Sequence, residues 1–240
     1  MAEDPIKLFA TRAERYPEPT EADTAQAIAK AGIAAIPVIG GPINQVLSLV
    51  LTPAVGRRRD EWLKELADAL DQMEKKVAGF RIEKLADNEA FVSATIQATL
   101  IAIGTHQREK REYLRNALLN IAKGITSDEI KQQVFLNAIE AFTPTHIKVL
   151  NVIWRGGGLN IGWDKNSIPM MQRTYGAAIE ILAPEVKGQT SLIGAVLADL
   201  RNRGFSNLGG PDLAFPQGGI ITNLGIEFLT FVLSPEDLPR

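Results

Sequence analysis

Few side chains in this chain could do chemistry. The chain has no cysteine, which excludes thiolate metal sites, disulfides and cysteine nucleophiles. It has two histidines, His106 and His146. His106 lies among Gln107, Arg108 and Glu109, and neither histidine has a neighbour at the spacing of a metal site. We therefore expect both histidines to be structural or exposed, with no catalytic residue, no metal ligand and no cofactor.

The glycine run Gly156–Gly158 invites a phosphate-loop interpretation. No strand pattern precedes the run, no helix opens from it, and it lacks the Lys-Ser/Thr ending of such loops. A loop between two helices fits the pattern better, and no small-molecule substrate is evident.

The composition of the 240 residues is that of a globular protein, with 45% apolar and 22% charged residues. Such a chain can form one large domain or two small ones. The net charge of -2 gives no general electrostatic reason to bind nucleic acid. The first residues lack the basic and apolar regions of a signal peptide, so we expect a cytoplasmic location.

The N-terminal elements surround an uncharged stretch. Residues 1–20 are predicted to be a flexible arm, and a helix is predicted to start at Thr20. "PVIGGP" then interrupts the pattern and predicts a helical hairpin. Its second arm, Ile43–Leu51, is expected to end at Thr52 and Pro53.

The uncharged stretch Ala31–Val55 has two interpretations, which stay open here. Each arm is shorter than the roughly twenty residues of a spanning helix, which favours a buried core hairpin or an oligomer interface. The three arginines that follow the stretch instead favour a membrane element that is released on activation. Their charges could hold anionic headgroups. The candidate contact residues are Ile36, Val38, Ile39, Ile43, Val46, Leu47, Val50, Arg57, Arg58 and Arg59.

The middle of the chain is predicted to be a helical bundle. One helix shows an apolar stripe at steps of three to four residues, opens with Asp60 and Glu61 and closes with Lys75 and Lys76. A second helical segment runs from Asp87 or Asn88 to Gly124, with a break at Gly104 and Thr105 left open. The stripe consists of Trp62, Leu66, Leu70 (or Ala69), Met73 and Val77.

Two further helix starts follow, with a cap at Thr126 or Ser127 and another at Thr143, where a proline takes the first helical position. The last part of the chain places the helix "SLIGAVLADLRNRG" before "RGFSNL", a Gly/Pro-rich loop and "IITNLGIEFLTFVL". This order resembles a winged-helix module, whose second wing strand often passes through a Thr-x-x-Gly turn into a closing helix.

The predicted fold class is thus mainly α: a helical hairpin and bundle over residues 21–126, then a winged-helix-like α+β domain over 127–240, with the boundary near residues 126–142. A helix that reads DNA needs several basic or amide side chains, and here only Arg201, Asn202 and Arg203 qualify. Nine Lys and Arg stand against eleven Asp and Glu from Asp128 to Arg240. Protein contact is therefore favoured over DNA binding.

The order of "RRRDEWLKELADALDQMEKKV", the helical middle and "FLNAIEAFTPTHIKVLNVI" resembles that of the Abi-alpha family, abortive-infection factors of bacteria and archaea. The match covers roughly residues 30–155, although the stretch "LRNALLNIA" stands where the family carries a tryptophan-containing motif. The resemblance implies a role in phage defence or cell suicide.

Two functional hypotheses follow from the sequence. The first is a non-enzymatic effector directed to an anionic membrane surface, peripheral on its inner face, through the apolar hairpin 31–55. The alternative is a soluble interaction or regulatory protein, whose hairpin is core or oligomer interface and whose winged helix binds a protein partner. Nucleic acid is the less favoured partner in both.

Overall fold

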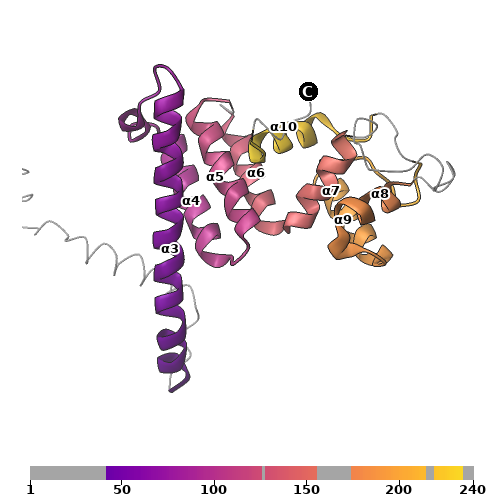
Figure 1. Ribbon diagram of the computed structural model, residues 1–240, viewed down its shortest axis with the longest axis horizontal. Coiled ribbons are helices and arrows are strands. Elements are labelled where there is room, and N and C mark those ends of the chain that lie inside the picture. The colour runs from indigo at the N-terminus through magenta and orange to yellow at the C-terminus, as the bar shows by residue number, and fades with distance from the viewer. Residues whose placement is uncertain (1–41, 126–127, 156–173, 215–218, 235–240) are drawn as a thin grey trace, which may run out of the picture. The chain divides into compact units, whose positions relative to one another are not determined.

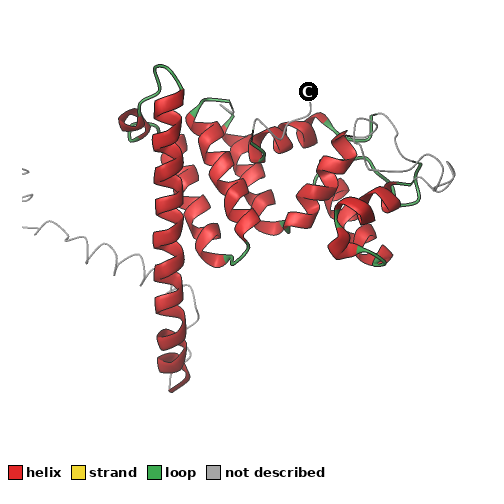
Figure 2. Cartoon of the chain, in the orientation of Figure 1, coloured by secondary structure: helices red, strands yellow, loops and turns green. Residues whose placement is uncertain are grey.

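The computed structural model describes residues 42–125, 128–155, 174–214 and 219–234. These residues form eight α-helices and two short 3-10 helices, and the described part of the chain contains no β-strand (Figures 1 and 2). The predicted mainly α fold and its helical bundle are confirmed. The chain forms two compact units, residues 1–58 and 59–240.

Helix α3 is continuous from Pro42 to Lys76 and contains Pro53 in its interior. The prediction that the second hairpin arm ends at Pro53 is therefore wrong, and so is a helix start at Asp60. A proline removes one intrahelical hydrogen bond at a local cost of about 3 kcal/mol. The chain that follows is rich in Leu, Lys, Glu and Arg, which favour helix strongly enough to continue it. The first arm and the turn of the predicted hairpin lie outside the described residues.

The C-terminal half of α3 buries the predicted apolar stripe. Its four side chains nearest the core, Trp62, Leu66, Leu70 and Met73, are each at most 9% exposed. Val77, predicted as the end of the stripe, follows the last helical residue and is exposed.

Side-chain contacts fix this half of α3 against two neighbouring helices. Trp62 Nε1 donates a hydrogen bond to Thr99 Oγ1 at 3.0 Å. Arg111 forms ion pairs with Glu61 and Glu65 at 3.5 and 3.4 Å. Since Thr99 and Arg111 lie on α4 and α5, these contacts join the C-terminal half of α3 to both helices, which follow it in Figure 1.

The segment from Asn88 to Gly124 is divided into α4 (Glu89–Gly104) and α5 (Arg108–Ala122). Asn88 caps α4 as predicted, accepting a hydrogen bond from the Phe91 amide. A short 3-10 helix, η1 (Ile82–Leu85), precedes α4. The break that the sequence left open is present, because Thr105 adopts extended backbone angles after Gly104.

Helix α6 (Glu129–Ala141) is capped by Asp128, whose carboxylate accepts hydrogen bonds from the Ile130 and Lys131 amides. The predicted cap at Thr126 or Ser127 is therefore wrong, since a carboxylate one residue later meets the positive helix end. Helix α7 (Pro144–Arg155) begins with Pro144, as predicted.

The C-terminal part contains α8 (Tyr175–Leu182), η4 (Pro184–Val186), α9 (Thr190–Asn202) and α10 (Asn223–Val232). Helix α8 and η4 lie where the sequence predicted only a loop region. Between the described parts of the two predicted wing strands, one isolated antiparallel bridge joins Ser206 to Ile221. Thr222 caps α10 by accepting from the Gly225 amide, which is the predicted Thr-x-x-Gly turn.

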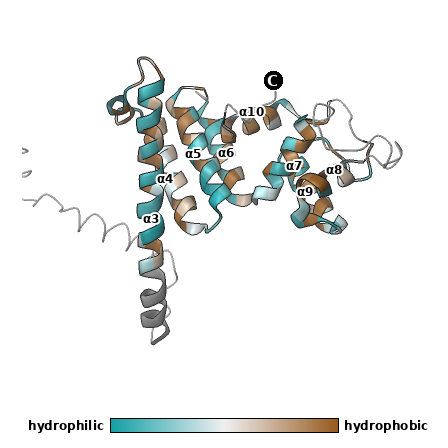
Figure 3. Ribbon diagram, in the orientation of Figure 1, coloured by the Kyte–Doolittle hydropathy of each residue, from teal (hydrophilic) through white to brown (hydrophobic). Residues whose placement is uncertain are grey.

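An aromatic cluster forms the centre of the 59–240 unit. Phe135 of α6 and Phe228 of α10 lie with Phe142 and Phe205 at centroid separations of 4.7 to 6.3 Å. All of these rings are at most 2% exposed, so together they bury a large apolar surface. Figure 3 shows how hydropathy differs between helices: the coloured part of α3 shows mainly polar residues on its visible side, and α9 shows many apolar residues.

The backbone approaches itself closely beside this cluster. A Cβ atom on Gly225 would lie 2.1 Å from the carbonyl oxygen of Phe205, which no side chain tolerates. The bare glycine lets the first turn of α10 pack against the loop after α9.

Helix α10 also binds α5, on the other side of the predicted domain boundary. The buried amide of Asn120 donates to the carbonyl oxygens of Thr230 and Phe231 at 3.1 and 2.8 Å. Both sides of residue 126 therefore lie in one compact unit. The predicted boundary between two domains near residues 126–142 stays a prediction.

Candidate functional site

The N-terminal half of α3 holds the part of the candidate contact set that the structure describes. With 3.6 residues per turn, Ile43, Val46, Leu47 and Val50 fall on one side of the helix. The polar residues Gln45, Ser48 and Thr52 fall on the opposite side. The three remaining apolar candidates, Ile36, Val38 and Ile39, lie outside the described residues.

The arginines of the candidate set lie in the interior of α3 rather than after a helix end. Consecutive residues are turned by 100° around a helix, so Arg57, Arg58 and Arg59 cannot share one face. Arg57 falls on the side of Val46 and Val50, and Arg58 falls at its edge. Arg59 falls on the polar side and forms an ion pair with Asp60 at 2.8 Å.

No helix within the described ranges combines the length and the apolar character needed to cross a membrane.

The end of α9 carries the other predicted contact residues, Arg201, Asn202 and Arg203, and all three are exposed. Arg201 donates to the carbonyl oxygen of Gly209 at 3.1 Å. The guanidinium carbon of Arg203 lies 5.3 Å from the centre of the Phe142 ring. Two of the three side chains therefore make contacts within the fold, which lowers their availability to a partner.

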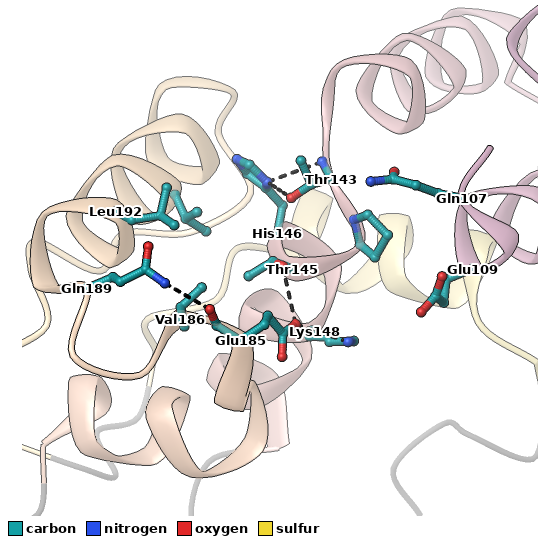
Figure 4. A pocket seen from close by; sticks show the side chains of 12 residues that line it. Gln107, Glu109, Thr143, Thr145, His146, Lys148, Glu185, Val186, Gln189 and Leu192 are labelled. Carbon is teal, nitrogen blue, oxygen red and sulfur yellow. Dashed lines mark hydrogen bonds and ion pairs between the residues drawn. The ribbon is translucent and has the colours of Figure 1, made fainter. Parts of the chain in front are cut away.

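His146 sits in the first turn of α7 and is 8% exposed (Figure 4). Its Nδ1 accepts from the Thr143 amide at 3.3 Å and lies 2.9 Å from Thr143 Oγ1. The proton of the neutral ring is then on Nε2, which lies 3.4 Å from Asp199 Oδ2. His146 thus caps its own helix and joins α7 to α9.

The surroundings of His146 favour its neutral form. Burial lowers the pKa of the imidazole and is the largest influence. The hydrogen bond and charge of Asp199 act to raise the pKa, while the charges of Arg203 and Lys110 add to the lowering. The ring also stacks on Phe142 with 4.8 Å between centroids.

A cleft of about 670 Å³ opens beside His146, between the starts of α5 and α7 and the η4–α9 segment (Figure 4). Lys148 Nζ lies 3.0 Å from Glu185 Oε1, and the Thr145 hydroxyl donates to the same oxygen at 3.3 Å. Burial acts to raise the pKa of Glu185, but its own backbone amide, Lys148 and Thr145 together lower it. We call this site the α7 cleft.

Beside the α7 cleft, a hydroxyl, an imidazole and a carboxylate follow one another in contact, from Thr143 through His146 to Asp199. That order is the one used in nucleophilic catalysis. Here the imidazole lone pair also accepts the Thr143 amide, and Asp199 is 63% exposed. The arrangement therefore suits helix capping and packing, in line with the structural role expected of His146. His106 is exposed.

A second cleft, of about 610 Å³, lies between α3 and α5 and was not predicted. Its cations come from three separate places, Lys76, Arg115 and Lys123, so only the register of the two helices brings them together. Lysines near two helix ends were visible in the sequence, but their proximity was not. We call this site the α3–α5 cleft.

No protein-family model, curated protein or solved structure matches this chain. Within the described ranges, no group of three or more His, Asp and Glu side chains gathers where it could hold a metal ion. The candidate sites are therefore argued from their own geometry.

Proposed function

We propose that this protein is a non-enzymatic effector that acts at an anionic membrane surface through the N-terminal half of α3. The observation that carries the proposal is the register of that helix. It collects Ile43, Val46, Leu47 and Val50 on one side and the uncharged polar residues on the other. A two-sided helix of this kind binds in the plane of a membrane interface.

The length of the uncharged segment supports contact in the interface rather than insertion across it. Residues 42–56 of α3 rise about 22 Å, less than the roughly 30 Å of a bilayer's hydrocarbon core. Asn44, Gln45 and Ser48 would be costly inside that core, but they can face headgroups and water. Arg57 and Arg58 directly follow this segment along α3, and their positive charges add attraction to anionic lipid.

The biological setting of the proposal comes from the resemblance to abortive-infection proteins, which suggests phage defence or cell suicide. In this proposal residues 127–240 form a winged-helix-like domain that contacts a protein. Its support is the Thr222 cap and the isolated Ser206–Ile221 bridge, in the order that such modules use.

The second candidate function is a soluble interaction protein. The same apolar side of α3 would then contact a partner protein or a second copy of this chain. Its support is the near-neutral net charge of -2 together with the absence of charged residues from positions 42–56 of the helix.

Flotation with phosphatidylglycerol vesicles tests the first candidate. The variant Val46→Glu/Val50→Glu places two carboxylates on the apolar side, and Gln45→Glu/Thr52→Glu places two on the polar side. Both variants carry the same added charge, so a difference between them reports the face and not the long-range repulsion. We expect at least a tenfold lower partition coefficient for the apolar-side variant, since each buried valine contributes about 1.5 kcal/mol or more.

Equal flotation of the two variants, or no flotation of the full chain under any activating condition, would remove the membrane function. Light scattering on the same samples then addresses the second candidate. An oligomer that dissociates only in the apolar-side variant would assign this face to protein contact.

A further inference from the structure

One side of α4 is both apolar and exposed. The exposed residues of this helix recur every three to four positions, so they form one stripe along it. After Glu89 they are Ser93, Ile96, Leu100 and Gly104, and we call these four residues the α4 face. Ile96 is 60% exposed and Leu100 is 62% exposed. Two large aliphatic side chains thus lie in the middle of the face, with a small residue at each end.

Helix α4 has the composition of a helix that is covered on all sides. Its opposite side is buried in the fold through Phe91, Ala98 and Ala102, so both sides of the helix are apolar. A helix that is apolar all round is normally buried. No Asp, Glu, Lys or Arg occurs from Ala90 to Gln107, in a chain with 22% charged residues. The α4 face therefore fits an apolar and uncharged partner.

The flanks of the α4 face belong to α3 and α6. On the α3 side, Leu63 follows the Trp62 side chain that bonds to α4, and it is 45% exposed. On the α6 side, the Gln97 amide donates to Asn137 at 2.8 Å, and the Gln133 amide donates to Gln97 at 3.1 Å. An amide both donates and accepts hydrogen bonds, so this amide cluster can bond to an identical cluster.

The sizes of the side chains along the α4 face follow the same order in both directions: small, large, large, small. A second copy of the chain that lies antiparallel therefore sets Ile96 against Leu100 twice and brings the small ends together. The two-fold axis of such a pair lies in the plane of the interface and crosses the helices. It places α6 beside α6 and α3 beside α3, so the amide cluster meets its own copy.

The ends of the paired helices are complementary in charge. With the axis midway between Ile96 and Leu100, Glu89 lies level with position 107 of the other copy. The next residue, Arg108, begins α5, and its side chain is 83% exposed while it pairs with Glu112 of its own helix at 3.4 Å. Glu89 and Arg108 can therefore pair across the interface, twice in each dimer.

We propose that the α4 face is the interface of a homodimer in which the two α4 helices pack antiparallel. Helix α4 is about 24 Å long and about 10 Å wide, so its face is smaller than the roughly 800 Å² that each partner buries in a standard interface. The dimer is therefore weak and forms as the concentration rises. The interface uses no residue of the apolar side proposed for membrane contact, so either proposal can hold without the other.

Sedimentation velocity of the full chain over a concentration series tests the interface. The variant Ile96→Gln/Leu100→Gln removes the two large apolar side chains of the α4 face. Its matched control, Ile130→Gln/Ile181→Gln, changes two exposed isoleucines elsewhere. We expect the dissociation constant of the dimer to rise at least tenfold in the α4 variant and less than twofold in the control. Urea denaturation of the same samples checks that the variants are folded.

Reversal of charge tests the antiparallel arrangement and leaves the apolar residues in place. Glu89→Arg and Arg108→Glu should each raise the dissociation constant about threefold, because like charges then meet across the interface. The double variant Glu89→Arg/Arg108→Glu restores both pairs and should return to within about twofold of the original value. Losses that add in the double variant would overturn the antiparallel pairing.

A full chain that stays monomeric at the highest concentration would overturn the homodimer, and so would equal losses in the α4 and control variants. A dimer that is lost only in Val46→Glu/Val50→Glu would place the contact on the N-terminal half of α3 and overturn the proposal for α4. A monomer that floats with phosphatidylglycerol vesicles, but fails to float as the α4 variant, would assign the α4 face to lipid instead.

Discussion

The two clefts of the 59–240 unit have similar volumes but differ in whether their cations are paired. In the α7 cleft, Lys148 pairs with Glu185, and His146 is bound by Thr143 and Asp199. In the α3–α5 cleft, the cations Arg115 and Lys123 have no ion partner within the described ranges.

This difference separates polar groups that hold helices together from charged groups that make no ion pair among the described residues. A buried group whose hydrogen bonds are all made within the fold stabilises the fold and loses much when it is removed. A cation exposed beside an apolar wall and without an ion partner contributes little to stability, so its removal should change the free energy of unfolding little. The two clefts can therefore be told apart by stability measurements alone.

The largest expected effect is that of His146→Ala in the α7 cleft. The variant removes a buried ring, the Nδ1 contact that caps α7 and the link to Asp199. We expect the free energy of unfolding to fall by about 2–3 kcal/mol, measured by urea denaturation. His106→Ala is the matched control and should change it by less than about 0.5 kcal/mol. Equal effects of the two substitutions would contradict the role of His146 in capping α7 and joining it to α9.

The pH dependence of stability should follow from the same residue. Because burial holds the pKa of His146 below its ordinary value of 6.5, the unfolded chain takes up this proton first as the pH falls. Stability is therefore full above pH 6.5 and is lost below it, down through the pKa of the folded state. The slope is at most about 1.4 kcal/mol per pH unit for one proton. Urea denaturation between pH 7 and 5 should show this decline, and His146→Gln should flatten it.

The smallest expected effect compares one lysine from each cleft. Lys148→Ala breaks a half-exposed ion pair and should lower the free energy of unfolding by about 0.5 kcal/mol. Lys123→Ala removes a cation without an ion partner in the described structure and should change it by about 0.3 kcal/mol or less. A larger loss for Lys123 than for Lys148 would reverse the assignment of the two clefts.

Features set by neighbours in the sequence could be predicted. The stripe from Trp62 to Met73 follows from helical periodicity, and the caps Asn88 and Thr222 follow from side chains that bind amides within one turn. Pro53 misled the prediction because a strong local breaker was outweighed by the helix formers after it. Helix α8 was missed although Thr174 caps it in the same manner, accepting from the Ala177 amide.

The sites depend on contacts between distant residues, and these could not be predicted from spacing. His146 meets Asp199 across 53 positions, and Asn120 meets Phe231 across 111. Only the packing of the helices decides such pairs. The same packing decides which lysines keep no partner, so neither cleft had a signal in the sequence.

The crowding around Gly225 has a genetic consequence. Every missense change of its codon adds at least a Cβ atom, and that atom would meet the Phe205 carbonyl oxygen at 2.1 Å. In a random mutagenesis screen for loss of function, substitutions at position 225 should therefore recur irrespective of the amino acid introduced. Such uniform intolerance at position 225 would support, in living cells, the close packing of the first turn of α10 against the loop after α9.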